Sequence, residues 1–285
     1  MKKSINYLKM LMISGVLVAG FNACQKESTN PQGSVISDLN SSQNAAKAEQ
    51  YSSDMSDIVD DANNSGTANR ASNESVFLSA CASVTKSSES YPRTITVDFG
   101  STNCKGNDGV WRRGKVIATF SGPYQNQGTV ITYRTQDFYV NDDKVDGSKT
   151  VTNMGLNSDQ HIHFSVSENM TISLANNTGT IMRSANRDRE WIAGSGTMAG
   201  YDDVYLMRGT SSLTTANGVQ YNSLIVNPLR KEMGYRYIVN GSLAVTRMSD
   251  NVNYATIDYG YPKGGRDDLA LVTFDNGTTK VIHIQ

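Results

Sequence analysis

Apolar and polar residues alternate along most of the chain from Val76 onward, the pattern of strands with one buried face. The alternation is clearest in residues 94–100, 115–120, 129–133, 161–166 and 279–284. Asn-Gly and Asp-Gly pairs, which tolerate the positive φ of tight hairpins, occur at 107–109, 146–147, 217–218, 240–241 and 276–277. The pattern predicts an all-β fold over residues 75–285, an antiparallel meander that forms a sandwich or a roll.

One segment before the strands has helical spacing. Met55, Ile58 and Val59 are three and four residues apart and fall on one side of a helix that starts near Ala45. The other side carries acidic residues: Asp54, Asp57, Asp60 and Asp61. We expect a short amphipathic helix within residues 44–64, packed on the β domain.

The first 23 residues have the composition of a signal peptide. Lys2 and Lys3 precede an apolar stretch at residues 8–20, which is too short to span a bilayer as a helix. Cys24 follows Ala23 directly after this stretch and resembles the cysteine of a lipobox, although Phe21 replaces the usual leucine. The sequence predicts cleavage before Cys24 and lipidation of that residue; a plain secretory signal with an incidental cysteine is the alternative.

Residues 24–43 are rich in Ser, Asn, Gln and Gly and are expected to form a flexible tether. The run Gln25-Lys26-Glu27 after the cysteine resembles the signal that exports lipoproteins of the Bacteroidota to the outer face of the outer membrane. We therefore expect an outer membrane lipoprotein, on the cell surface or on the periplasmic face.

The net charge of the chain limits the kinds of partner that it can be expected to bind. The chain has a formal net charge of −1, and the first 23 residues contain three Lys and no acidic residue, so the mature chain is more acidic still. A mildly acidic protein lacks the basic surface that binds nucleic acid, and it also lacks a basic patch for anionic lipid. Membrane attachment is therefore expected to come from the lipid at Cys24 alone.

Three cysteines are present, and lipidation of Cys24 leaves Cys81 and Cys104. An even pair in an oxidising compartment usually forms a disulfide, so we expect this bond; two separate buried thiols are the alternative. No Cys-x-x-Cys or Cys/His cluster indicates zinc.

Several polar residues could carry chemistry. His161 and His163 project from one face of a predicted strand and could ligate a metal, although a polar exposed face is the simpler interpretation, and His283 cannot be placed beside them. Acidic pairs recur at 142–143, 202–203 and 267–268; they could bind calcium, but turn chemistry alone explains them.

Catalytic motifs are not found in the sequence. Glu168 and Glu190 are the acids considered for a glycosidase pair, and no nucleophile elbow, Walker motif or dinucleotide motif occurs. The chain has 14 Tyr together with Trp111 and Trp191. Most of them are expected in the core or in cross-strand pairs, and an aromatic binding face for sugars or peptides is the alternative.

A weak internal echo is also present. Gly147, Gly194 and Gly241 each lie in an apolar-x-Gly-Ser segment and are 47 residues apart. Three similar hairpin units would explain the spacing, and chance is the alternative.

Three blocks in combination resemble a known group of proteins. They are Ile95 to Val116 with Cys104, Phe138 to Asn153, and Asp202 to Thr210. The group consists of uncharacterised exported lipoproteins of the Bacteroidota, and the resemblance extends from about residue 91 to the end. It implies an exported lipoprotein; the second cysteine pair that the group often has is absent, because residues 234–239 and 264–268 contain no Cys.

These observations favour a lipid-anchored envelope protein with a non-catalytic binding or structural role, for a glycan or protein ligand, without a metal or cofactor. A surface glycan hydrolase is the first alternative and should show a deep cleft with convergent polar groups. A periplasmic lipid carrier is the second and should show a continuous apolar tunnel.

Overall fold

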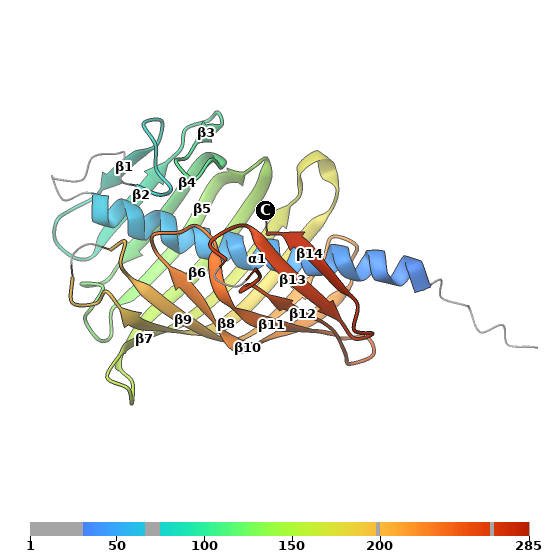
Figure 1. The fold of residues 1–285 in the computed structure, drawn as a ribbon. Helices are drawn as coiled ribbons and strands as arrows, with labels where there is room; N and C mark the ends of the chain where they lie inside the picture. Colours follow the sequence, from blue (N-terminus) through green and yellow to red (C-terminus); the bar gives the residue numbers. More distant parts are fainter. Residues whose placement is uncertain (1–30, 66–74, 198–199, 263–264, 285) are drawn as a thin grey trace, which may run out of the picture.

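The computed structural model describes residues 31–65, 75–197, 200–262 and 265–284 (Figure 1). One long helix, α1 (Pro31–Ser65), precedes the strands. The strands follow in the order β1 (Ser83–Lys86), β2 (Arg93–Asp98), β3 (Cys104–Lys105), β4 (Trp111–Phe120), β5 (Val130–Val140), β6 (Asp143–Leu156), β7 (Ile162–Ser173), β8 (Thr180–Ala193), β9 (Val204–Thr214), β10 (Gln220–Glu232), β11 (Ile238–Arg247), β12 (Val252–Asp258), β13 (Leu269–Phe274) and β14 (Thr279–His283).

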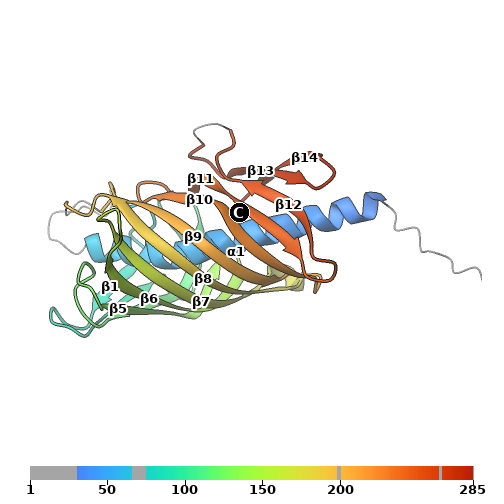
Figure 2. The same cartoon turned by 90° about the horizontal axis from the view of Figure 1, so that it is seen from below.

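All strands belong to one antiparallel sheet. Apart from β3, which pairs only with β4, each strand lies beside its neighbours in sequence, from β1 at one edge to β14 at the other. The sheet is open and curves around α1, which runs lengthwise along its concave side (Figures 1 and 2). The expected all-β antiparallel meander with a helix before it is confirmed.

The helix is longer than its sequence pattern indicates. It begins at Pro31, a residue type favoured at the first helical position, and so includes much of the segment assigned to the tether. Ser and Asn are weak helix formers, but burial against the sheet offsets their low propensity. Ser41 and Ser42 are buried, and the Tyr221 hydroxyl donates to Ser41 Oγ at 3.0 Å.

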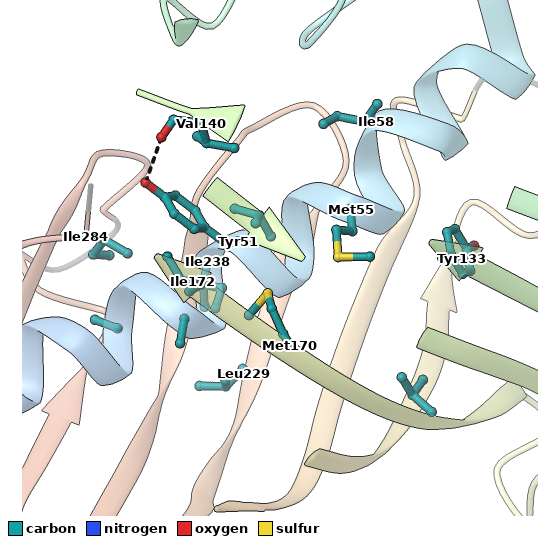
Figure 3. Packing of buried hydrophobic residues seen from close by; sticks show 14 of the residues in the cluster. Tyr51, Met55, Ile58, Tyr133, Val140, Met170, Ile172, Leu229, Ile238 and Ile284 are labelled. Atoms are coloured by element: carbon teal, nitrogen blue, oxygen red, sulfur yellow. Dashed lines mark hydrogen bonds between the residues drawn. The ribbon is translucent and has the colours of Figure 1, made fainter. Parts of the chain in front are cut away.

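The apolar side of α1 packs on the inner face of the sheet, as Figure 3 shows for Tyr51, Met55 and Ile58. The Tyr51 hydroxyl contacts the Val140 carbonyl oxygen at 3.4 Å and donates to Asp143 Oδ2 at 2.9 Å. The helix is therefore held by directional contacts as well as by apolar burial.

The opposite side of α1 is also covered, which the sequence pattern did not predict. Asp54, Asp57 and Asp61 are buried, although their spacing indicated the solvent-facing side of an amphipathic helix. Because the sheet curves around the helix, inward side chains of the sheet reach both sides of it. The acidic residues therefore meet cations: Asp54 lies 3.0 Å from Arg236 and Asp57 lies 3.1 Å from Lys231.

Two of the Gly pairs expected in turns lie within strands instead. Gly147 is in β6 and Gly241 is in β11. A Cβ atom at Gly147 would lie 2.9 Å from the sulfur of Met55, so this glycine allows the helix to approach the sheet. The pairs at 107–109, 217–218 and 276–277 do lie in turns.

The three glycines of the 47-residue echo differ in their position relative to the strands. Gly147 lies within β6, Gly194 follows the end of β8, and Gly241 lies within β11. Two complete strands lie between the first pair and two between the second, but Gly194 lies outside a strand whereas the other two lie within one.

Cys81 and Cys104 are joined by a disulfide with an S–S distance of 1.98 Å, as the cysteine count predicts. The bond ties the segment before β1 to β3. The helix described has no apolar stretch of the length and hydropathy that crossing a membrane requires.

Candidate functional site

A hollow of about 460 Å³ opens at one end of the curved sheet, where the C-terminal part of α1 meets the ends of β8 and β9. We call it the Trp191 hollow. Its lining combines aromatic, amide and charged side chains: Asp60, Asn63, Lys86, Arg93, Tyr124, Gln125, Asn126, Trp191, Asp203 and Tyr205. Concave sites with a few converging polar groups and aromatic walls are the usual form of a small-ligand site.

Three aromatic rings line one side of the hollow, and two of them, Trp191 and Tyr205, are also part of the core, at 5 % and 2 % exposed. Trp191 on β8 stacks on Tyr205 on β9, with ring centroids 5.6 Å apart and planes at 28°. Tyr124 meets the Trp191 ring edge-on at 5.6 Å. Direct cross-strand pairing places Trp191 opposite Tyr205, so the sheet register itself aligns the two rings.

Asp203 lies against this wall, immediately before β9. The Trp191 indole N–H donates to Asp203 Oδ1 at 3.2 Å. Gly194, with φ of +90°, allows this approach, because a Cβ atom there would lie 2.2 Å from the same oxygen. Burial is the main cause that raises the pKa of Asp203 to about 7, and the negative charge of Asp60 adds to the rise.

Asp60, which lines the hollow, forms an ion pair between the helix and the sheet. Asp60 lies 3.2 Å from Nη2 of Arg189, whose guanidinium stacks 3.7 Å from the Tyr205 ring centroid. On the rim, Arg93 donates to the Asn63 side-chain oxygen at 2.8 Å. The hollow therefore brings the Asp203 carboxyl, which titrates near neutral pH, close to arginine side chains and aromatic rings. This arrangement suits a polar ligand with an apolar face.

The two histidines singled out from the sequence lie elsewhere, on the outer face of the sheet. His161 Nδ1 is 2.8 Å from Glu190 Oε1, and His163 Nδ1 is 2.8 Å from Asp188 Oδ1. The His161 hydrogen bond is the main cause that lowers the pKa of Glu190 to about 2, and Arg208, at 2.7 Å, contributes. Each histidine thus pairs with its own carboxylate, and His283 pairs separately with Asp268 at 2.6 Å.

No group of three or more His, Cys, Asp or Glu side chains suited to a metal occurs among the described residues. The acidic pairs are split between different partners. Asp142 contacts Arg113 at the surface, whereas Asp143 is buried and lies 2.7 Å from Lys47. Asp202 accepts from Thr197 at 2.9 Å, whereas Asp203 faces Trp191.

Glu168 and Glu190 do not form a catalytic pair. Strand alternation places Glu168 on the inner face, where it contacts Lys149 at 3.4 Å, and Glu190 on the outer face. A glycosidase needs its two carboxyl groups on opposite sides of one sugar. The sheet separates these two.

The space between helix and sheet differs from a lipid tunnel. Within the described residues, a cavity of about 30 Å³ lies there, and its lining is charged and hydroxylated, with Glu49, Asp57, Lys149, Arg187 and Lys231 among its residues. An acyl chain requires a continuous apolar channel, which this polar interior does not provide.

The sequence predictions included Trp191 among the aromatic residues and Asp203 among the acidic pairs, but they did not bring the two together. Arg93 and Arg189 were not singled out at all. A signal for Arg189 is present: Arg183, Arg187 and Arg189 share one strand face with Trp191, and cations repeated on a buried face indicate buried ion pairs.

Cys24 and the signal segment lie outside the described residues. Comparisons with protein-family models, curated proteins and solved structures find no match for this chain.

Proposed function

We propose that the protein is a lipid-anchored envelope protein that binds a polar ligand in the Trp191 hollow without transforming it. The hollow carries the proposal, because it combines stacked rings with a carboxyl and amides in one concave site. The expected lipid at Cys24 would hold the domain at the outer membrane. Aromatic walls with converging amides suit a sugar unit or a short peptide.

The chemistry of the hollow supports binding over catalysis. Asp60 is paired with Arg189 and Asp203 accepts the Trp191 N–H, so both carboxyl groups have structural partners.

Trp191 itself can report occupancy. The chain has two Trp residues, and Trp111 is exposed on β4, so the Trp111→Phe variant leaves Trp191 as the single indole. Titration of this variant with chito- and cello-oligosaccharides and with a short-peptide library should change Trp191 emission in a saturable way. An unchanged emission with every probe would contradict the proposed binding.

A surface glycan hydrolase is the second candidate, because a carboxyl with a pKa of about 7 is suited to act as a general acid near neutral pH. Release of reducing ends from the same oligosaccharides, abolished in Asp203→Asn, would establish hydrolysis. Binding without any release supports the non-catalytic role.

The lipid anchor expected at Cys24 can be tested independently of ligand binding in the Trp191 hollow. Mass spectrometry of the mature protein should find Cys24 at the N-terminus with acyl chains attached. A Cys24→Ala variant should lose processing or membrane attachment, and a processed, membrane-bound variant would refute the anchor.

A further inference from the structure

The outer face of the sheet carries a row of short side chains that crosses twelve strands. Each member faces the next across a strand pair in the recorded register. We call this row the hydroxyl ladder; its members are Thr94, Thr119, Thr132, Thr150, Ser167, Asn186, Thr210, Leu224, Ala244, Thr256, Thr273 and Thr279. At about 4.8 Å per strand, eleven steps extend the ladder for about 50 Å along the curved face.

A second row runs beside the central part of the ladder, two residues away along each strand. Its members, also paired in register from β5 to β11, are Arg134, Ser148, Asn169, Ser184, Ser212, Asn222 and Thr246. Most of these side chains are exposed, because the strands alternate between buried and exposed positions. Together the two rows form a strip of hydroxyl and amide groups that is interrupted at Arg134, Leu224 and Ala244.

The strip is almost free of charge, which is unusual for an exposed sheet face. At the chain-wide share of 19 % charged residues, nineteen positions would hold about four charged side chains. The strip holds one, Arg134. The charges of these strands lie outside the strip, on both faces of the sheet. Lys149, Arg183 and Arg187 meet the helix and its partners on the inner face. Asp188, Glu190 and Arg208 lie on the outer face, beside the strip.

The hydroxyl and amide groups of the central rungs are available for a ligand. The hydroxyl groups of Thr94 and Thr119 hydrogen-bond to each other at 2.9 Å. By contrast, the side chains of Thr150, Ser167 and Asn186 form no hydrogen bond to another side chain in the part of the chain that the structure describes. Hollows of about 720 and 460 Å³ indent the strip, bordered by Ser184 and Ser212. Each hydroxyl both donates and accepts, as does each amide group.

The composition distinguishes between partners. Protein interfaces depend on aromatic residues, Met and Arg, whereas Ser and Thr are under-represented among the residues that contribute most binding energy. Nucleic acids and anionic lipids require cations. A neutral partner with many hydroxyl or acetamido groups matches both the lack of charge and the repeated donors and acceptors.

We propose that the hydroxyl ladder is a docking surface for an uncharged polysaccharide chain, laid across the strands and hydrogen-bonded rung by rung. A flexible glycan can follow the curvature of the sheet. Leu224 offers an apolar patch for the C–H face of a sugar ring. This surface is separate from the Trp191 hollow, so it does not rest on the function proposed for that site.

The test is retention of the detergent-solubilised full chain on microcrystalline cellulose, chitin and insoluble β-1,3-glucan, with heparin beads as the charged comparison. One variant places three charges on the ladder: Thr150→Lys, Asn186→Lys and Thr210→Lys. Its charge-matched control carries Ser101→Lys, Ser158→Lys and Ser249→Lys in exposed loops. A third variant carries Thr132→Val, Thr150→Val and Thr210→Val, which remove three hydroxyl groups at nearly constant side-chain shape. If the lysine variant does not fold, this valine variant tests the proposal.

We expect the parent and the loop control to be retained on at least one uncharged polysaccharide. Each ladder variant should lose about tenfold or more in affinity, since every lost hydrogen bond weakens binding. Absence of retention on all three supports, equal retention of the valine variant, or stronger retention on heparin would overturn the proposal. Concentration-dependent self-association that the ladder variants lose would also overturn it and would assign the face to a second copy of the chain.

Discussion

The Glu49 carboxylate of α1 lies 2.7 Å from Nη2 of Arg183 on β8, and both side chains are less than 5 % exposed. Arg187 approaches the same oxygen at 2.9 Å. The pair joins the first element of the chain to the middle of the sheet, 134 residues later. Because buried charges are tolerated only when they are paired, these contacts restrict the helix to one position along the sheet.

Glu49→Gln should destabilise the protein by about 3 kcal/mol, because it leaves the buried Arg187 guanidinium without its carboxylate and leaves Arg183 with Glu168 alone. Urea unfolding followed by circular dichroism measures the change. Glu89→Gln is the control, since Glu89 is exposed and should shift the free energy of unfolding by less than about 0.5 kcal/mol. Equal effects of the two substitutions would show that the buried pair contributes nothing.

The same carboxylate predicts a loss of stability in acid. The guanidinium groups of Arg183 and Arg187 outweigh the opposing effect of burial and lower the pKa of Glu49 to about 2. A carboxyl whose pKa is lowered in the fold stabilises it above the ordinary pKa near 4.5, and this stabilisation is lost as the pH falls from there towards 2. When unfolding is measured from pH 6 to pH 2, the loss should be about 3 kcal/mol larger in the parent protein than in Glu49→Gln, which keeps the contributions of the other carboxyl groups. Parallel curves for the two proteins would contradict this assignment.

The disulfide should stabilise the fold by about 3 kcal/mol, since it closes a loop between Cys81 and Cys104 in the unfolded chain. A Cys81→Ser, Cys104→Ser variant should unfold at lower urea concentration by that amount. Reductant should destabilise the parent protein equally and leave the variant unchanged. A parent protein that is insensitive to reductant under unfolding conditions would show that the bond is not formed.

Two glycines with nearly equal positive φ angles should differ in their tolerance of alanine. Gly114, with φ of +82°, would place a Cβ atom 1.8 Å from the Asp137 carbonyl oxygen, whereas Gly109, with φ of +79°, has nothing within 4 Å. Gly109→Ala should cost about 1 kcal/mol of strain, and Gly114→Ala should cost at least about 2 kcal/mol more because β4 and β5 must separate there. Thermal unfolding of both variants tests the difference, and similar melting temperatures would contradict it.

The sequence pattern was sufficient for the all-β class and the antiparallel meander, because a period of two residues with one buried face is a local signal. It was insufficient for α1. The start at Pro31 depends on burial of Ser41 and Ser42 against strands near the other end of the chain, and no local property of these residues indicates it. The acidic side of the helix was misassigned for the same reason, since its cations come from distant strands.

The site was less predictable than the fold. Trp191 and Asp203 are twelve residues apart on opposite sides of a connection, and their contact depends on the positive φ of Gly194 and on the register of β8 and β9. The hydroxyl ladder could not be predicted from the sequence either. Its members look like ordinary solvent-facing residues until the register aligns them across the sheet.

The raised pKa of Asp203 makes the Trp191 hollow sensitive to pH near neutrality. A carboxyl with a pKa of about 7 in the fold and an ordinary value of 3.8 favours the folded state in its protonated form, and this contribution is lost as the pH rises through 7. In the Trp111→Phe background, ionisation of Asp203 beside the indole N–H should shift Trp191 emission with a midpoint near pH 7. Asp203→Asn should abolish the transition, and Asp202→Asn, which changes the exposed neighbour, should preserve it. A midpoint near pH 4 would mean that solvent reaches Asp203 freely, and it would remove the reason to consider this carboxyl as a general acid.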